Sequence, residues 1–159
     1  MEMELKDLKP SSNEDLIKVE FEFDEDGNPT RWFRVLGANS DEYQEAERAW
    51  RVKNVQKAAR RGRAIEAATQ TGAQELVLQT EKRELALITA CLKEVHGFFF
   101  VNGDPCPANE ATLKTIFKAR PQWRFKTLQA IESEQVFTSS SSAPGVPSTE
   151  KVPQSQTAD

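Results

Sequence analysis

The side chains that most often carry catalysis or bind metals are scarce in this 159-residue chain. It has one histidine, His96, and two cysteines, Cys91 and Cys106. A zinc site needs four ligands at tight spacings, whereas these three are irregularly spaced and lack an obvious fourth. No serine or cysteine lies in a nucleophile-elbow pattern, and the glycine motifs of phosphate-binding and dinucleotide-binding loops are absent. We therefore expect no catalytic residue, no cofactor and no metal, and interpret the three side chains as a packed thiol, a helix-end imidazole and a loop thiol.

Two charged clusters allow binding chemistry without catalysis. Asp24, Glu25 and Asp26 could hold calcium, but their loop is too short for the twelve-residue calcium-binding pattern and lacks its terminal glutamate. A solvated turn is the simpler interpretation.

The second cluster runs from Arg48 to Arg63 and contains seven lysines or arginines with no acidic residue. Clustered cations of this kind can contact the phosphates of a nucleic acid. They can equally form a solvated helix face that pairs with acidic surfaces, such as the Glu20 and Glu22 face or another subunit. No known nucleic-acid-reading motif accompanies the run, which favours the second interpretation. A small nucleic-acid-binding regulator remains the alternative function.

Composition limits the class of protein. Hydrophobic residues make up 38% of the chain and charged residues 29%, and the formal net charge is −4, so no global attraction to nucleic acid or anionic membrane is expected. No apolar run approaches the roughly 20 residues of a membrane span. The N-terminus MEMELKDLKP lacks the basic start and apolar centre of a signal peptide. We expect a cytoplasmic protein with both thiols reduced.

The most apolar stretch runs from Leu76 to Gly103 and organises the rest. Residues spaced by seven, three, four and three predict one face of an α-helix that ends at Val95-His96-Gly97, with Gly97 in the left-handed conformation at the C′ position. These residues are Leu78, Leu85, Ile88, Leu92 and Val95. The aromatic cluster Phe98–Val101 follows, and we expect some of its rings to point inward and others to serve a neighbour.

Strict alternation at the start of the chain predicts strands. Residues 16–24 and 30–36 read as two strands joined by the turn residues Asp24-Glu25-Asp26-Gly27-Asn28-Pro29, which gives a β-hairpin over residues 16–36. A lone hairpin is only marginally stable in water. Its apolar face must therefore pack on helices, or its edges must pair with another copy of the chain.

The remaining residues predict helices with recognisable ends. Ser40 or Asn39 caps a helix that Gly62 interrupts near Arg61, and whether residues 40–70 form one helix or two stays open. Asn109 caps a helix over residues 110–119, with Leu113, Ile116 and Phe117 inward. Pro121 begins a last helix, in which Trp123, Leu128 and Ile131 form the buried side and Val136-Phe137 closes the domain.

Together these elements predict an α+β fold that is mainly α. An N-terminal β-hairpin is followed by a small helical bundle of four to five helices within a single domain at residues 15–137, with the helices over 40–137. Residues 1–14 are predicted to be a flexible arm. Residues 138–159 are rich in Ser, Thr and Pro, and are predicted to be a disordered tail.

The order of these pieces resembles one family. The hairpin has an Asp-Gly turn, the junction over residues 37–43 reads Gly-Ala-Asn-Ser-Asp-Glu-Tyr, and a basic, alanine-rich helix follows. The central helix leads into an aromatic stretch with Asn102-Gly103; Pro107, Asn109, Leu113, a Lys-Ala-Arg-Pro break and the closing Val136-Phe137 come after it. Over residues 16–137 the chain resembles the tail assembly chaperones of long-tailed bacteriophages. It departs from them at Phe98-Phe99-Phe100, where relatives would have a tryptophan-containing segment.

The resemblance implies a non-enzymatic role in phage morphogenesis. Such chaperones bind and solubilise the tape-measure protein, help to recruit tail-tube subunits in the host cell cytoplasm and are absent from the mature virion. It implies the tape-measure and tail-tube proteins as partners, with self-association through the hairpin edge, and neither a nucleic acid nor a membrane. Trp50, Phe98 and Phe99 are candidate client contacts, although the sequence assigns no site residue.

Overall fold

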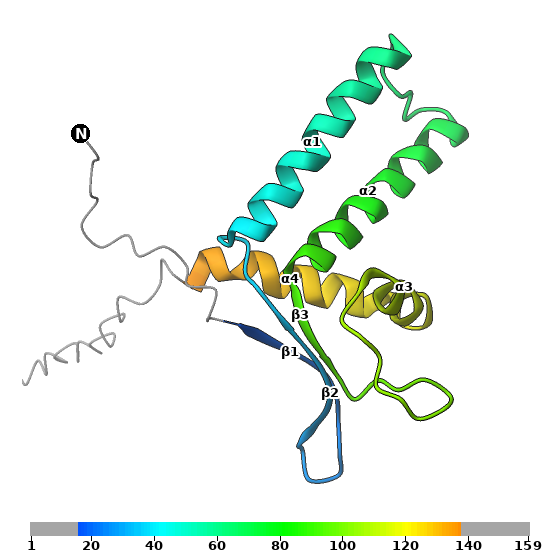
Figure 1. Ribbon diagram of the computed structural model, residues 1–159. Helices are drawn as coiled ribbons and strands as arrows, with labels where there is room; N and C mark the ends of the chain where they lie inside the picture. The colour runs from blue at the N-terminus through cyan, green and yellow to red at the C-terminus, as the bar shows by residue number, and fades with distance from the viewer. Residues whose placement is uncertain (1–15, 138–159) are drawn as a thin grey trace, which may run out of the picture.

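A computed structural model describes residues 16–137, which contain three strands and four helices (Figure 1). In chain order these are β1 (Ile17–Phe23), β2 (Pro29–Val35), α1 (Asp41–Arg61), α2 (Gln70–Cys91), β3 (Leu92–His96), α3 (Glu110–Ala119) and α4 (Pro121–Phe137). The predicted mainly helical α+β fold with an N-terminal hairpin is confirmed. The predicted arm at residues 1–14 and tail at residues 138–159 lie outside the described residues.

The sheet is antiparallel with the order β1-β2-β3. The predicted hairpin is confirmed, and Asp24 closes its turn by accepting hydrogen bonds at Oδ1 from the backbone N–H groups of Asp26 and Asn28. Val19 and Phe33 are buried in the core. Phe23 lies four residues after Val19 and would share its face in a regular strand, but it is exposed, because the β1–β2 register shifts between Glu20 and Glu22 and again before Phe23.

The third strand was not predicted. The helix expected to run to Val95 ends at Cys91, and residues 92–96 pair with β2. The register shifts between Arg34 and Val35, so that Lys93 is an extra residue opposite β2. Leu92 and Val95 therefore both pack toward the core although they are three residues apart, a spacing that mimics a helix. Gly97 does have a positive φ of 83°, but it follows a strand and not a helix.

The first two helices form a long antiparallel hairpin that projects from the sheet (Figure 1). The open question about residues 40–70 is answered by one helix, α1, which ends before the left-handed Gly62. Ser40 is its N-cap, and Ser40 Oγ accepts a hydrogen bond from the N–H of Tyr43. After a loop, Thr69 caps α2 in the same way through the N–H of Gly72.

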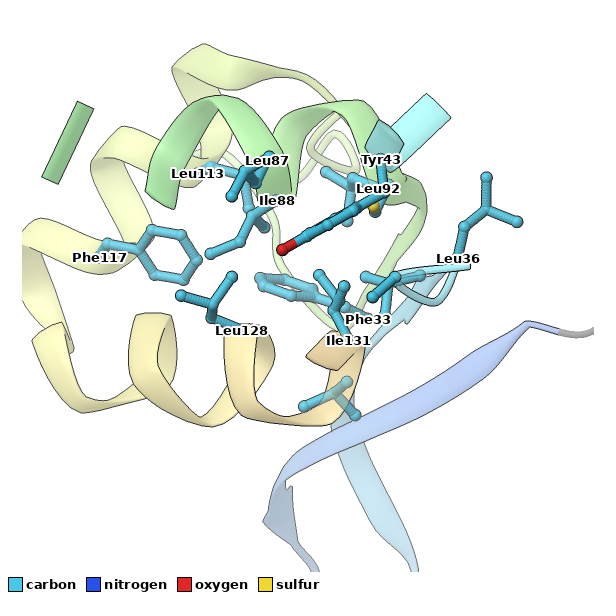
Figure 2. Close-up of a cluster of buried hydrophobic side chains, with 14 of the residues drawn as sticks. Phe33, Leu36, Tyr43, Leu87, Ile88, Leu92, Leu113, Phe117, Leu128 and Ile131 are labelled. Carbon is cyan, nitrogen blue, oxygen red and sulfur yellow. The ribbon is translucent and has the colours of Figure 1, made fainter. Parts of the chain in front are cut away.

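The core lies where the sheet, the C-terminal half of α2, α3 and α4 meet (Figure 2). Leu113, Ile116 and Phe117 of α3 are buried as predicted. Of the side predicted for α4, Leu128 and Ile131 are buried and Trp123 is partly buried. Val136 and Phe137 end α4, and their side chains lie outside the described part of the chain.

Candidate functional site

An open apolar groove of about 550 Å³ separates the loop after β3 from α3 and the start of α4. Its loop side is formed by Phe98, Phe99, Phe100, Val101, Cys106 and Pro107. Its helix side is formed by Ala111, Thr112, Thr115, Ile116 and Ala119, and Trp123 of α4 also lines it. The groove is thus lined by carbon-rich side chains at a place where three separate segments of the chain converge.

The aromatic loop divides its side chains between the core and the solvent. Phe98 packs inward, with its ring centroid 5.6 Å from that of Phe33 and 6.0 Å from that of Trp123. Phe99 and Phe100 remain 65% and 51% exposed, and Val101 is fully exposed. The predicted division of this cluster between inward and outward side chains is confirmed, whereas the predicted contact of the outward ones with a neighbour stays a prediction. The division leaves three large apolar side chains in water next to one another, which monomeric proteins seldom do without a partner.

Backbone hydrogen bonds hold these rings in place. The N–H of Phe100 donates to the carbonyl of Asp104 at 2.8 Å, and the N–H of Cys106 donates to the carbonyl of Phe98 at 2.9 Å. Phe99 also forms an isolated antiparallel bridge with Pro105. The exposed rings are therefore presented by an ordered loop, so less conformational entropy is lost when a partner covers them.

The opposite wall is a row of small side chains on α3. Ala111, Thr115 and Ala119 are spaced by four residues and so share one side of the helix. Asn109 orients this helix as predicted, because Asn109 Oδ1 accepts a hydrogen bond from the N–H of Thr112 at 2.9 Å. The row was not predicted from the sequence, in which the buried stripe of α3 is the stronger signal. Its only trace there is the four-residue repeat of small residues.

The charged residues that line the groove are Arg31 and Arg120, and no carboxylate is among the lining residues. Arg31 is already paired, since its Nη1 lies 3.0 Å from Glu22 Oε2 and its Nε donates to the carbonyl of Gly97 at 3.1 Å. Arg120 is exposed, and its Nη1 lies 3.5 Å from the carbonyl oxygen of Ala119. The groove therefore combines apolar walls with a net positive rim.

The structure separates the side chains that the sequence offered for metal binding. Cys91 is buried in the core, Cys106 lines the groove, and His96 stacks on Trp32 across β2 and β3 with ring centroids 3.6 Å apart. Within residues 16–137, no group of three or more His, Cys, Asp or Glu side chains could hold a metal ion.

The candidate client contacts fall in two places. Phe98 and Phe99 both line the groove, whereas Trp50 lies partly buried on α1 and is not among the lining residues. Phe100 and Val101 line the groove as further members of the Phe98–Val101 cluster, whereas the small-residue row of α3 was not singled out in the sequence.

The basic run lies on α1 and in the loop after it, away from the groove. Arg51 pairs with Glu47 at 3.2 Å, and Arg61 pairs with Glu75 of α2. The suggested pairing with Glu20 and Glu22 is wrong, since these residues pair with Lys18 and Arg31.

The clearly shifted pKa values also belong to α1 and are structural. Burial raises the pKa of Tyr43, and the nearby carboxylates of Glu132 and Glu47 raise it further. Burial would raise the pKa of Glu47 as well, but its hydrogen bond with Arg83 and the charge of Arg51 outweigh burial and lower it.

Comparison with known proteins gives no further identification. Neither a protein-family model, nor a curated protein sequence, nor a solved structure matches this chain. Within residues 16–137, no helix has both the length and the apolar character needed to cross a lipid bilayer.

Proposed function

We propose that this protein is a tail assembly chaperone of a long-tailed bacteriophage, which binds apolar helical segments of the tape-measure protein and keeps that protein soluble. The observation that carries the proposal is the uncovered groove, in which Phe99, Phe100 and Val101 stand in solvent opposite the small-residue row of α3. The motif order described above supports the choice of family.

The physical requirement of such a role suits this groove. A long helical rod exposes apolar stripes that aggregate in water unless a partner covers them. A groove with apolar walls receives one face of an amphipathic helix and buries its large side chains. Each groove covers only a few turns, so a rod needs many copies bound side by side, and modest affinity at each is sufficient.

The remaining parts of the proposal come from the family alone. The chaperone would act in the host cell cytoplasm, help to recruit tail-tube subunits and be absent from the mature virion. Self-association would use an exposed sheet edge. The β2 edge of the hairpin is occupied by β3, which leaves β1 and β3 as the edge strands among the described residues.

Co-expression tests the proposal. The tape-measure protein encoded alongside this chain should stay in the soluble fraction with the wild type and co-purify with it. The double variant Phe99→Ser/Phe100→Ser should lose most of this effect, because it removes apolar surface that only a partner would cover. Val55→Ser is the matched control, since Val55 is an equally exposed apolar residue on α1. A tape-measure protein that is insoluble with the wild type, or equally soluble with the double variant, would refute the proposal.

One observation favours the nucleic-acid alternative. Lys53, Lys57 and Arg60 lie four and three residues apart on one side of α1, are exposed, and form no ion pair with any described side chain, that is, with residues 16–133. If this side contacts phosphates, a gel shift at low salt should appear with the wild type and fade when the three residues are changed to glutamine. The absence of a shift removes this alternative.

A further inference from the structure

We propose that the groove selects helical segments that carry a carboxylate beside their apolar stripe, and that Arg120 recognises this carboxylate. The inference rests on the proposed function, because it specifies the chemistry of the client that the same groove accepts. It goes further by assigning a specificity-determining residue to a site whose walls are otherwise apolar.

The shape of the groove favours a helix as its occupant. Ala111, Thr115 and Ala119 form a straight row about 12 Å long at 1.5 Å per residue, which matches two to three helical turns. Small side chains along such a row let a second helix approach closely. The aromatic wall on the other side offers ring faces to anchor residues spaced by three, four and seven.

The charged residues that line the groove determine which client helices it binds. The lining residues include two arginines and no carboxylate. Arg31 is neutralised by Glu22, and the nearest acid on α3, Glu110, is paired with Lys114 at 2.8 Å. Arg120 has no carboxylate partner among the side chains described, which are those of residues 16–133. A client carboxylate would therefore gain an ion pair here, whereas a client lysine would meet unbalanced positive charge.

Arg120 is well placed for this role because its backbone is fixed while its side chain is exposed. Its N–H donates to the carbonyl of Ile116 at 2.8 Å, and its carbonyl accepts from the N–H of Trp123 at 3.1 Å. Pro121 follows directly and begins α4. A guanidinium held at such a junction offers two parallel N–H groups to a carboxylate.

A simpler role for Arg120 is to complement the C-terminal end of α3, where a cation stabilises the helix dipole. That role would affect the stability of the folded protein and would not discriminate between ligands. Binding selectivity measured on equally folded variants therefore separates the two explanations.

The experiment uses two fluorescent peptides as probes. Both are 14-residue helices with the same leucine and alanine face, and they differ only in having glutamate or lysine at the positions that flank this face. The full-length wild type should bind the glutamate peptide roughly fivefold more tightly by fluorescence anisotropy, as expected for a partly screened ion pair. The preference should shrink at about 0.5 M salt, where the Debye length is a few ångströms.

Three variants locate the preference. Arg120→Gln should bind both peptides about equally, and Arg120→Glu should prefer the lysine peptide. Lys118→Gln is the matched control, because Lys118 is an exposed cation two residues away that does not line this groove. Circular dichroism and thermal melting establish that all three are folded. Equal binding of the two peptides by the wild type, or a preference that survives Arg120→Gln, would overturn the inference.

The assignment to Arg120 and the proposed chaperone function can fail separately, and the experiments distinguish the two failures. If neither peptide binds while solubilisation of the tape-measure protein still depends on Phe99 and Phe100, the assignment to Arg120 is wrong and the chaperone role stands. If Phe99→Ser/Phe100→Ser changes neither peptide binding nor solubilisation, the groove is not the site, and both the proposed function and the inference fail.

Discussion

The base and the tip of the α1–α2 hairpin are built from the same two helices but have very different surroundings. Near the sheet, Tyr43, Leu87 and Ile88 are buried. Toward the tip, Val55 is 70% exposed and Val77 is 57% exposed, although both lie on the same two helices. The difference shows that the pairing of α1 with α2 does not by itself bury the apolar residues of either helix. These residues are buried only where further elements of the core pack against the pair.

The position at which this additional packing ends can be located on α2. Arg124 of α4 lies 3.7 Å from Glu81 and 2.9 Å from Glu84, so α4 covers the helix up to about this level. Beyond this level, the tip of the hairpin is stabilised by local features of the two helices and the loop between them. These are the left-handed Gly62, the Thr69 cap and the ion pair between Arg61 and Glu75. We therefore expect the hairpin to be stable at its base and to open readily at its tip.

The largest expected effect is at the base. Ile88→Ala removes a fully buried side chain from the core and should lower the free energy of unfolding by about 2–5 kcal/mol, measured by urea denaturation. Val77→Ala is the matched control, because Val77 lies three turns earlier on the same side of α2 and is largely solvated. Its change should stay within about 0.5 kcal/mol. Similar losses for the two variants would contradict the contrast between base and tip.

The structure at the base of the α1–α2 hairpin could be predicted from the sequence only in part, and β3 is the element that shows the reason. Local end signals at Ser40, Gly62, Asn109 and Pro121 place α1, α3 and the start of α4 correctly, since capping depends on neighbouring residues alone. The end of α2 depends instead on pairing with β2, which lies far away in the chain. The bulge at Lys93 moreover gives Leu92 and Val95 a helical spacing, so periodicity favoured the wrong element.

The groove was predictable to a similar extent. The sequence identified the Phe98–Val101 cluster and a division of its rings between inward and outward positions, and Phe99, Phe100 and Val101 are indeed exposed. It could not show which element lies opposite. The small-residue row of α3 and Arg120 acquire their meaning from tertiary packing against that loop.

A smaller effect is expected midway along the hairpin, at the ion network of Glu47. Its Oε1 lies 3.1 Å from Arg83 of α2 and 3.2 Å from Arg51. The pKa of Glu47 is lowered on folding, so its contribution is present above the unfolded pKa and is lost as the pH falls through the lower folded value. Glu47→Gln should cost about 0.5–1 kcal/mol at pH 7 and reduce the acid sensitivity of unfolding.

A neighbouring carboxylate provides the control for that pH dependence. Glu45 lies two residues earlier on α1, is exposed, and has no ion pair with a side chain of residues 16–133. Glu45→Gln should leave the dependence of unfolding on pH unchanged. If both variants show the same dependence as the wild type between pH 3 and pH 7, a range that brackets the usual pKa of about 4.3 for glutamate, the bridge from Glu47 to α2 contributes nothing.

The smallest effect is expected at the tip. Val55→Ser exchanges one solvated side chain for another of similar helix propensity, so the free energy of unfolding should change by less than about 0.5 kcal/mol. Hydrogen exchange in the same variant should show amides of residues 52–61 and 70–80 exchanging faster than those of residues 84–91, as in the wild type. A loss above 1 kcal/mol, or strong protection at the tip, would mean that Val55 is covered in solution by a surface absent from the folded monomer, because a solvated valine has no burial to lose.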